Sequence, residues 1–158
     1  MDIPTILDLG VKLAVMSGGG VTVYTYWKNS SLKRAEWLYQ LYQKFYEEDH
    51  YKEIRRILDY DPADDLGRLR YGIENDCECQ LVEALVDYLN FFEFIATLWQ
   101  LKQLTLKELS MVFQYYVLEL RKHDFVMEFM HNEGFRSLPA LIDALSRKAK
   151  DKEGGSKV

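Results

Sequence analysis

The alternation of apolar and polar positions predicts helices along most of the chain, and the clearest lies between Cys79 and Leu101. Apolar residues recur there at alternating steps of four and three, which is the spacing of one helical face. This stripe consists of Leu81, Leu85, Tyr88, Phe92, Ile95 and Trp99. Further apolar residues cover most of the remaining circumference, as in a central helix with neighbours on several sides. We therefore expect residues 79–101 to form the centre of the core.

Two helical patterns are expected before this central stretch. Residues 31–47 have the pattern of an amphipathic helix, with the apolar face Leu32, Ala35, Leu38, Leu41, Tyr42 and Phe45. A shorter helix is expected to begin at Asp49 and to turn Tyr51, Ile54 and Leu58 inward. Between Tyr60 and Asp76 the pattern fails, and the acidic residues there predict a turn followed by a solvated loop.

Three helical patterns follow the central stretch. Thr105 and Glu108 have the spacing of a capping box, which predicts a helix running to Leu120. The short connection after Leu101 predicts that this helix forms an antiparallel hairpin with residues 79–101. A helix over residues 124–133 is expected to end at Gly134, and Ser137 is expected to cap a final helix.

These patterns predict an all-α fold, an irregular bundle of about five helices with an N-terminal hydrophobic helix. We expect three parts: a hydrophobic segment over residues 1–28, a helical domain over residues 29–148, and a tail over residues 149–158. The tail is expected to be disordered, because apolar side chains are almost absent from it.

The N-terminal residues 3–27 are about long enough to cross a bilayer, for which roughly 20 apolar residues suffice. Aromatic residues cluster at the end of this segment, and Lys28, Lys33 and Arg34 follow. The positive charges predict an anchor in the cytoplasmic membrane with the C-terminal domain in the cytoplasm. The alternative is a helix packed on the domain, because Asp8 and Lys12 would each cost about 2.5–3.5 kcal/mol in the middle of a membrane.

Composition narrows the class of protein. The chain has 158 residues, a hydrophobic fraction of 48% and a net charge of −5. The hydrophobic fraction is sufficient for a packed core, and the negative charge argues against a nucleic-acid partner. Cys77 and Cys79 stand too close together for an unstrained disulfide, which favours a reducing compartment.

A resemblance adds to this description. The chain contains KRAEWL, KFYE and IRRILDY in its first half, then LNFFEFIA, and GFRSLPALI near its end. In these features, from about Tyr24 to Ile142, it resembles a family of uncharacterised bacterial proteins, a domain-of-unknown-function family. Its members tend to join an N-terminal transmembrane helix to a small helical cytosolic domain. The resemblance implies a membrane-associated helical protein and brings no activity, cofactor or catalytic residue.

Three groups of residues are candidates for a metal-binding or catalytic site. Glu83, Asp87, Asn90 and Glu93 share one side of the central helix, as metal-binding carboxylates do, but no histidine has the required spacing. We expect a polar stripe instead, with Glu93 paired to an arginine. The Cys77–Cys79 pair lacks close zinc partners, and the only histidines are His50, His123 and His131. The last two are expected to serve as polar groups at helix ends.

The sequence therefore predicts no catalytic, cofactor-binding or metal-binding residues, and it favours a protein that is not an enzyme. We expect a non-catalytic, membrane-anchored helical interaction protein with a protein partner or a second copy of itself. The alternatives are a soluble helical module that binds a partner, or a metalloprotein built on the Glu83–Glu93 carboxylates.

Overall fold

The computed structural model describes residues 29, 31–60, 64–76 and 79–154, and this part of the chain contains helices and no strand. The all-α prediction is confirmed. The chain divides into two compact units, residues 1–41 and residues 42–158. In the first unit, residues 31–41 are helical. The predicted membrane segment, residues 3–27, lies outside the described residues, among which no helix is long and apolar enough to cross a membrane.

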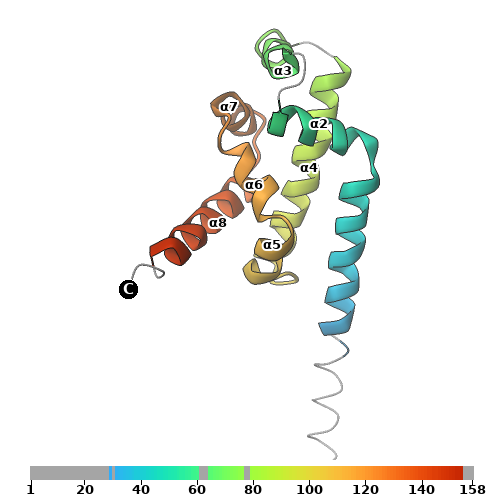
Figure 1. Cartoon of the computed structure of the whole chain (residues 1–158), viewed down its shortest axis with the longest axis vertical. Helices are drawn as coiled ribbons and strands as arrows, with labels where there is room; N and C mark the ends of the chain where they lie inside the picture. Colours follow the sequence, from blue (N-terminus) through green and yellow to red (C-terminus); the bar gives the residue numbers. More distant parts are fainter. Residues whose placement is uncertain (1–28, 30, 61–63, 77–78, 155–158) are drawn as a thin grey trace, which may run out of the picture. The chain divides into compact units, whose positions relative to one another are not determined.

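The second unit starts within the helical run of residues 31–47 and continues as a series of further helices (Figure 1). Over the described residues these are α2 (Asp49–Tyr60), α3 (Asp65–Glu74), α4 (Gln80–Gln100), α5 (Leu106–Val112), α6 (Gln114–Leu120), α7 (Asp124–Asn132) and α8 (Ser137–Gly154). The described helices are thus more numerous than the predicted five, because one predicted helix is divided and one predicted loop is helical.

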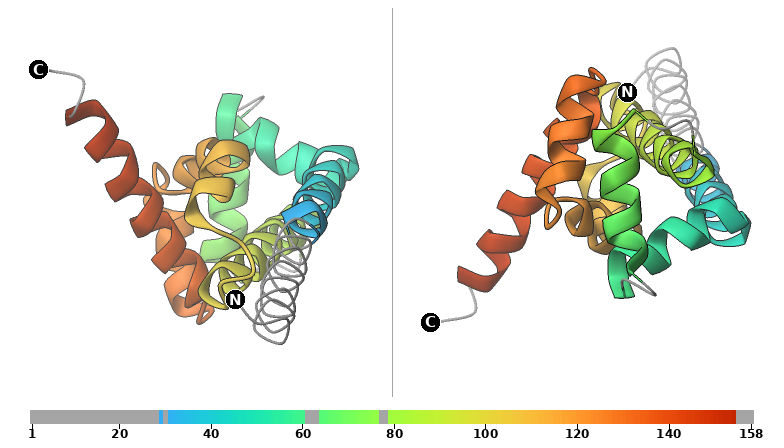
Figure 2. Two further views of the ribbon diagram at one scale, coloured as in Figure 1. Left: turned by 90° about the horizontal axis from the view of Figure 1, so that it is seen from below. Right: turned by 90° about the horizontal axis from the view of Figure 1, so that it is seen from above.

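Helix α4 is the central helix of this unit, as predicted. Its buried face includes Leu85, Tyr88, Phe92 and Ile95, whereas Leu81 and Trp99 at the ends of the stripe are partly exposed. The helices that pack most extensively against α4 are α2 and α8 (Figures 1 and 2). The expected hairpin between α4 and residues 105–120 is therefore not the most extensive contact of α4. The last helix, α8, packs more extensively on α4.

An aromatic cluster around Phe45 explains why the helix after Thr105 is divided. The Phe45 ring is fully buried and lies 5.3 Å from the Phe92 ring and 5.6 Å from the Phe113 ring, measured between centroids. Phe113 lies between α5 and α6, so the chain bends where this ring enters the core. The Arg55 guanidinium lies 4.5 Å from the centroid of the Phe45 ring, which adds a cation–π contact.

Two predicted irregular segments are helical. The expected loop between Tyr60 and Asp76 contains α3, because Leu69 and Gly72 are buried and hold one face of that segment on the domain. Helix α8 continues to Gly154, so residues 149–154 are not the disordered tail that their composition indicated. Polar composition alone did not distinguish a solvated helix from a disordered segment.

Candidate functional site

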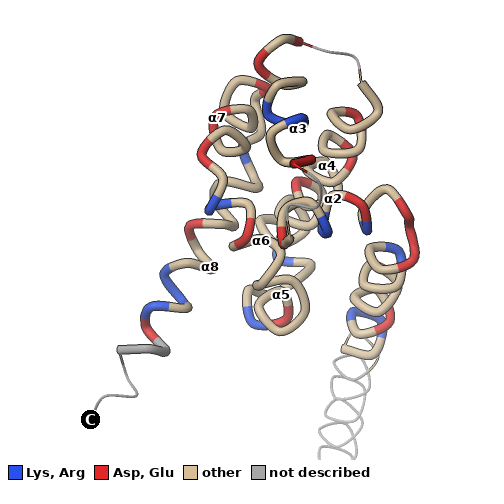
Figure 3. The backbone as a smooth tube through the Cα atoms, turned by 45° about the horizontal axis from the view of Figure 1, so that its top comes forward, with Lys and Arg blue, Asp and Glu red and all other residues tan. Residues whose placement is uncertain are grey.

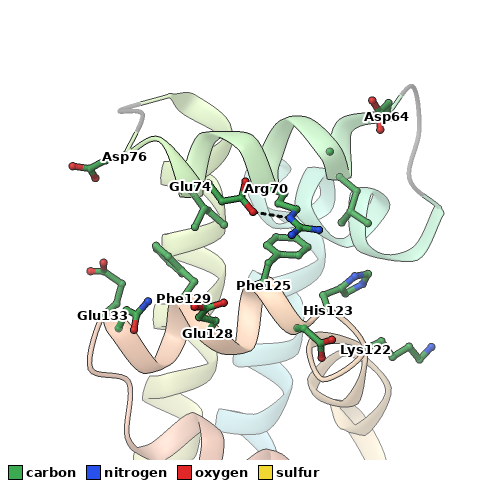
Figure 4. A pocket seen from close by; sticks show the side chains of 15 residues that line it. Asp64, Arg70, Glu74, Asp76, Lys122, His123, Phe125, Glu128, Phe129 and Glu133 are labelled. Carbon is green, nitrogen blue, oxygen red and sulfur yellow. Dashed lines mark hydrogen bonds and ion pairs between the residues drawn. The ribbon is translucent and has the colours of Figure 1, made fainter.

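Among the described residues, a groove of about 860 Å³ lies between α3 and α7. Figure 4 shows Phe125 and Phe129 of α7 on one side, below the side chains of α3 on the other. Both helices run in the same direction along it, so Asp76 and Glu133 lie at one end and Asp64 and His123 at the other. The groove is open to solvent along its length.

Local sequence fixes the two helices that form the groove. Asp64 precedes α3 with a left-handed backbone, φ 59°, and a Cβ atom at Gly67 would lie only 2.7 Å from its carboxylate. Helix α7 ends at Gly134, whose φ of +79° is favourable for glycine. The backbone N–H of Phe135 then donates to the carbonyl of Met130 at 3.0 Å, which closes a Schellman motif. The predicted glycine cap is confirmed.

The floor of the groove is apolar. It consists of Leu66, Gly67 and Ile73 from α3 and of Phe125 and Phe129 from α7. The four larger side chains are half-buried, neither packed into the core nor fully solvated. Such side chains offer apolar area that a bound molecule would remove from water, which favours binding by roughly 25 cal/mol per Å².

The rim of the groove is acidic. Six exposed carboxylates surround the floor: Asp64, Glu74, Asp76, Asp124, Glu128 and Glu133. In Figure 3 these acidic positions are visible along α3 and α7. Of the six, only Glu74 forms an ion pair within the described residues. The other five carboxylates therefore leave a negative potential over an apolar surface.

The basic side chains of the rim are already engaged by carboxylates of the chain. Arg70 donates from Nε to Glu74 Oε1 at 2.8 Å, and Lys122 donates to Glu119 at 2.5 Å. The hydrogen bond and charge of Glu74 raise the pKa of Arg70 above its usual value, and Glu128 adds to this effect. These pairs neutralise the two cations, so the rim as a whole stays negative.

His123 lies at one end of the groove and begins α7. Its side chain forms no capping hydrogen bond, contrary to the expected polar role at a helix end. Its Nε2 atom is buried and has no partner within the described part of the chain. Buried polar atoms are usually hydrogen-bonded, so this nitrogen has capacity for a ligand group or a water.

The predicted polar stripe of α4 has a structural role. Among the described residues Glu93 pairs with no arginine side chain. Its carboxylate accepts the backbone N–H groups of Arg136 at 3.2 Å, Ser137 at 2.9 Å and Leu138 at 2.6 Å. Glu93 therefore caps α8 in place of Ser137. The Ser137 hydroxyl instead bonds to Gln100 at 3.2 Å. The cap was missed because backbone donors leave no signature in the sequence.

The other metal and catalytic candidates are not brought together. Among the described residues, no group of three or more His, Cys, Asp or Glu side chains is placed to hold a metal ion. Glu83 and Asp87 are exposed on α4, away from the groove lining, and Glu93 is engaged with α8. Cys79 precedes α4, and Cys77 lies outside the described residues.

No protein-family model, curated protein or solved structure matches this chain. The functional argument therefore depends on the groove itself. The sequence did not predict the groove, because half of its rim lies in the segment that was expected to be a loop. The signal that could have located it is the density of acidic residues in two segments, residues 64–76 and 124–133, each interrupted by large apolar side chains.

Proposed function

We propose that this chain is a non-catalytic helical interaction protein that binds a protein partner in the groove between α3 and α7. The observation that carries the proposal is the combination of a half-buried apolar floor with five carboxylates that form no ion pair within the described residues. Protein-binding surfaces commonly have an apolar centre and a polar rim. The fully buried core of the domain lies around α4, so the exposed carboxylates of the rim are not part of it.

The chemistry of the groove favours binding over catalysis. The described lining residues include no serine, threonine or cysteine that could act as a nucleophile. A histidine general base needs a reacting group within hydrogen-bond reach and is usually oriented by a third residue. The Nε2 atom of His123 is buried, and no described residue forms a hydrogen bond with it.

We further propose that residues 3–27 hold the protein at the cytoplasmic membrane, with the C-terminal domain in the cytoplasm. The length of this segment, its terminal aromatic residues and the basic residues Lys28, Lys33 and Arg34 support this proposal. The resemblance to uncharacterised bacterial proteins with an N-terminal transmembrane helix supports the same arrangement. An anchor would keep the helical domain tethered to the membrane, where it would meet other membrane-associated proteins.

Cell fractionation tests the anchor. The full-length protein should remain with membranes that have been washed at high salt and alkaline pH, and deletion of residues 1–27 should release a folded, soluble domain. Circular dichroism of the deletion variant would establish that it is folded. A full-length protein in the soluble fraction, together with an unfolded deletion variant, would instead show that the segment belongs to the folded core.

A further inference from the structure

The unpaired carboxylates of the groove define the charge of its ligand. Five carboxylates that form no ion pair in the described part of the chain surround an apolar floor, while Arg70 and Lys122 are neutralised by carboxylates of the chain itself. Opposite charge across an interface favours association and discriminates against partners of like charge. A ligand with lysine or arginine side chains would complement this rim, and an acidic ligand would be repelled.

The apolar floor defines the second property of the ligand. Phe125 and Phe129 stand four residues apart on α7 and point toward α3 (Figure 4). A small hydrophilic cation would leave both rings in contact with water. A ligand that also carries leucine-like or aromatic side chains would cover them, and the burial would add to the charge pairing.

The length of the rim defines the form of the ligand. Asp64 and Asp76 flank α3, whose 10 residues span roughly 15 Å along its axis at about 1.5 Å per helical residue. A segment that pairs with both ends must therefore extend over about three helical turns. The described residues contain no strand edge for β-augmentation. A helix laid in the groove between two helices is the recognition mode that this open groove favours.

We infer that the groove between α3 and α7 is the docking site for a basic amphipathic helix of a partner protein. Leucine-like side chains of that helix cover Phe125 and Phe129, and its lysine or arginine side chains pair with the carboxylates of the rim. The inference rests on the proposed function, because it names the kind of segment that the interaction surface accepts.

A peptide binding experiment with the full-length protein tests the inference. The probe is a fluorescent, amidated peptide of about 18 residues built from alanine, leucine and lysine, long enough to form a helix. The matched peptides replace every lysine by glutamate, or every leucine by alanine. Spermidine serves as the small cation. Fluorescence anisotropy is measured in uncharged detergent, and detergent without protein is the blank.

The expected result is saturable binding of the basic amphipathic peptide and at least about tenfold weaker binding of both matched peptides. Glu133→Lys reverses a rim charge and should weaken binding about tenfold, whereas the control Glu83→Lys, exposed on α4, should leave it unchanged. Arg70→Gln removes a cation and releases Glu74, so it should strengthen binding severalfold. Tighter binding cannot be explained by a damaged fold.

The floor is tested separately. Phe129→Ala should weaken binding, and Met111→Ala, an exposed apolar residue outside the groove lining, should not. Circular dichroism establishes that each variant is folded. If Phe129→Ala does not fold, Glu133→Lys and Arg70→Gln still decide the outcome, because both side chains are exposed.

Other outcomes would overturn the inference in distinguishable ways. If the glutamate peptide binds as tightly as the basic peptide, and Phe129→Ala weakens its binding, the groove is a binding site but its ligand is not basic. If the alanine-for-leucine peptide binds as tightly as the basic amphipathic peptide, the groove attracts cations in general. Competition by spermidine at the same concentration of positive charge would indicate the same. Self-association abolished by Glu133→Lys would identify a second copy as the occupant. Binding of none of the peptides would refute both this inference and the proposed groove function.

Discussion

At the scale of single residues, the contact that most clearly fixes the arrangement of the domain is the one between Glu93 and the start of α8. One carboxylate accepts three backbone N–H groups that a helix leaves without an internal partner. Its negative charge also lies at the positive end of the helix dipole. Glu93 therefore aligns its own helix with a helix that begins 44 residues later, at Ser137.

Removing this carboxylate should destabilise the domain. Glu93→Ala should lower the free energy of unfolding by about 2–3 kcal/mol, because three donors lose a charged acceptor. Glu93→Gln keeps one acceptor oxygen and should have a smaller effect. Glu83→Ala, exposed on the same helix, is the matched control and should be near neutral. Urea denaturation measures all three, and equal losses for Glu83→Ala and Glu93→Ala would contradict the capping role.

Tyr88 should make the domain sensitive to alkaline pH. Burial raises the pKa of Tyr88 well above its ordinary value of 10.0, because the phenolate would lose its hydration. Its contribution to stability is therefore fully present below about pH 10 and decreases as the pH rises from there toward the pKa of the folded state. Tyr88→Phe should reduce the loss of unfolding free energy between about pH 8 and pH 11.

The control for this measurement is Tyr60→Phe, since Tyr60 is 79% exposed. Some alkaline loss should remain in Tyr88→Phe, because desolvation also raises the pKa values of Tyr46 and Tyr51. A pH dependence that is identical in the wild type and in Tyr88→Phe would show that the buried phenol is not responsible.

The centre of the core and the edge of its stripe should respond differently to truncation. Phe92→Ala should cost about 3–5 kcal/mol, because the ring is fully buried within the aromatic cluster. Trp99→Ala should cost less, since Trp99 is partly exposed near the end of α4. Chemical denaturation of both variants measures the difference. A larger loss for Trp99→Ala would place the centre of the core nearer the C-terminal end of α4.

At the scale of elements, the helices with strong periodicity could be predicted from the sequence. The central helix, the Thr105–Glu108 capping box and the Gly134 cap were all predicted and are present. Helix α3 was missed because its charged residues are as numerous as its apolar ones and two glycines interrupt the pattern, although Leu69 and Gly72 hold it on the domain. The break at Phe113 depends on a ring contact with Phe45, which is distant in sequence.

The groove could not be predicted because it depends on contacts between segments that are distant in sequence. Its floor is made by two short helices that are separated by α4, α5 and α6 along the chain. Each helix alone resembles an ordinary solvated segment with a few apolar residues. Only the fold places the apolar residues of both segments opposite each other.

The end of α7 offers a test at the scale of an element. Gly134→Ala should destabilise the domain by about 1–2 kcal/mol, because the left-handed backbone penalises a Cβ atom. A Cβ atom there would meet nothing within 4 Å, so the loss would be due to backbone conformation alone. Gly134→Asn should lose less, since asparagine tolerates this conformation better. Thermal unfolding ranks the three proteins, and equal stability would refute the strained cap.

At the scale of the whole molecule, the described residues combine a closely packed apolar core with a surface groove that is both apolar and acidic. The core around α4 is densely aromatic, whereas the α3–α7 groove holds apolar residues and unpaired carboxylates in one place. The carboxylates and apolar side chains of the groove favour solubility and binding more than the stability of the fold. Substitutions on the rim, such as Glu133→Lys, should therefore change ligand affinity while leaving the free energy of unfolding within about 0.5 kcal/mol.

The position of α8 also bears on how the chain is made. Leu138, Leu141, Ile142 and Leu145 are fully buried, and α8 packs extensively on α4. Synthesis adds about 5–20 residues per second, so roughly 40 residues separate the end of α4 from its partner for about 2–8 seconds. During that interval one face of α4 stays uncovered on the nascent chain. Completion of the domain thus waits for residues 137–145 to leave the ribosome, and until then the uncovered face is the kind of apolar surface that chaperones protect.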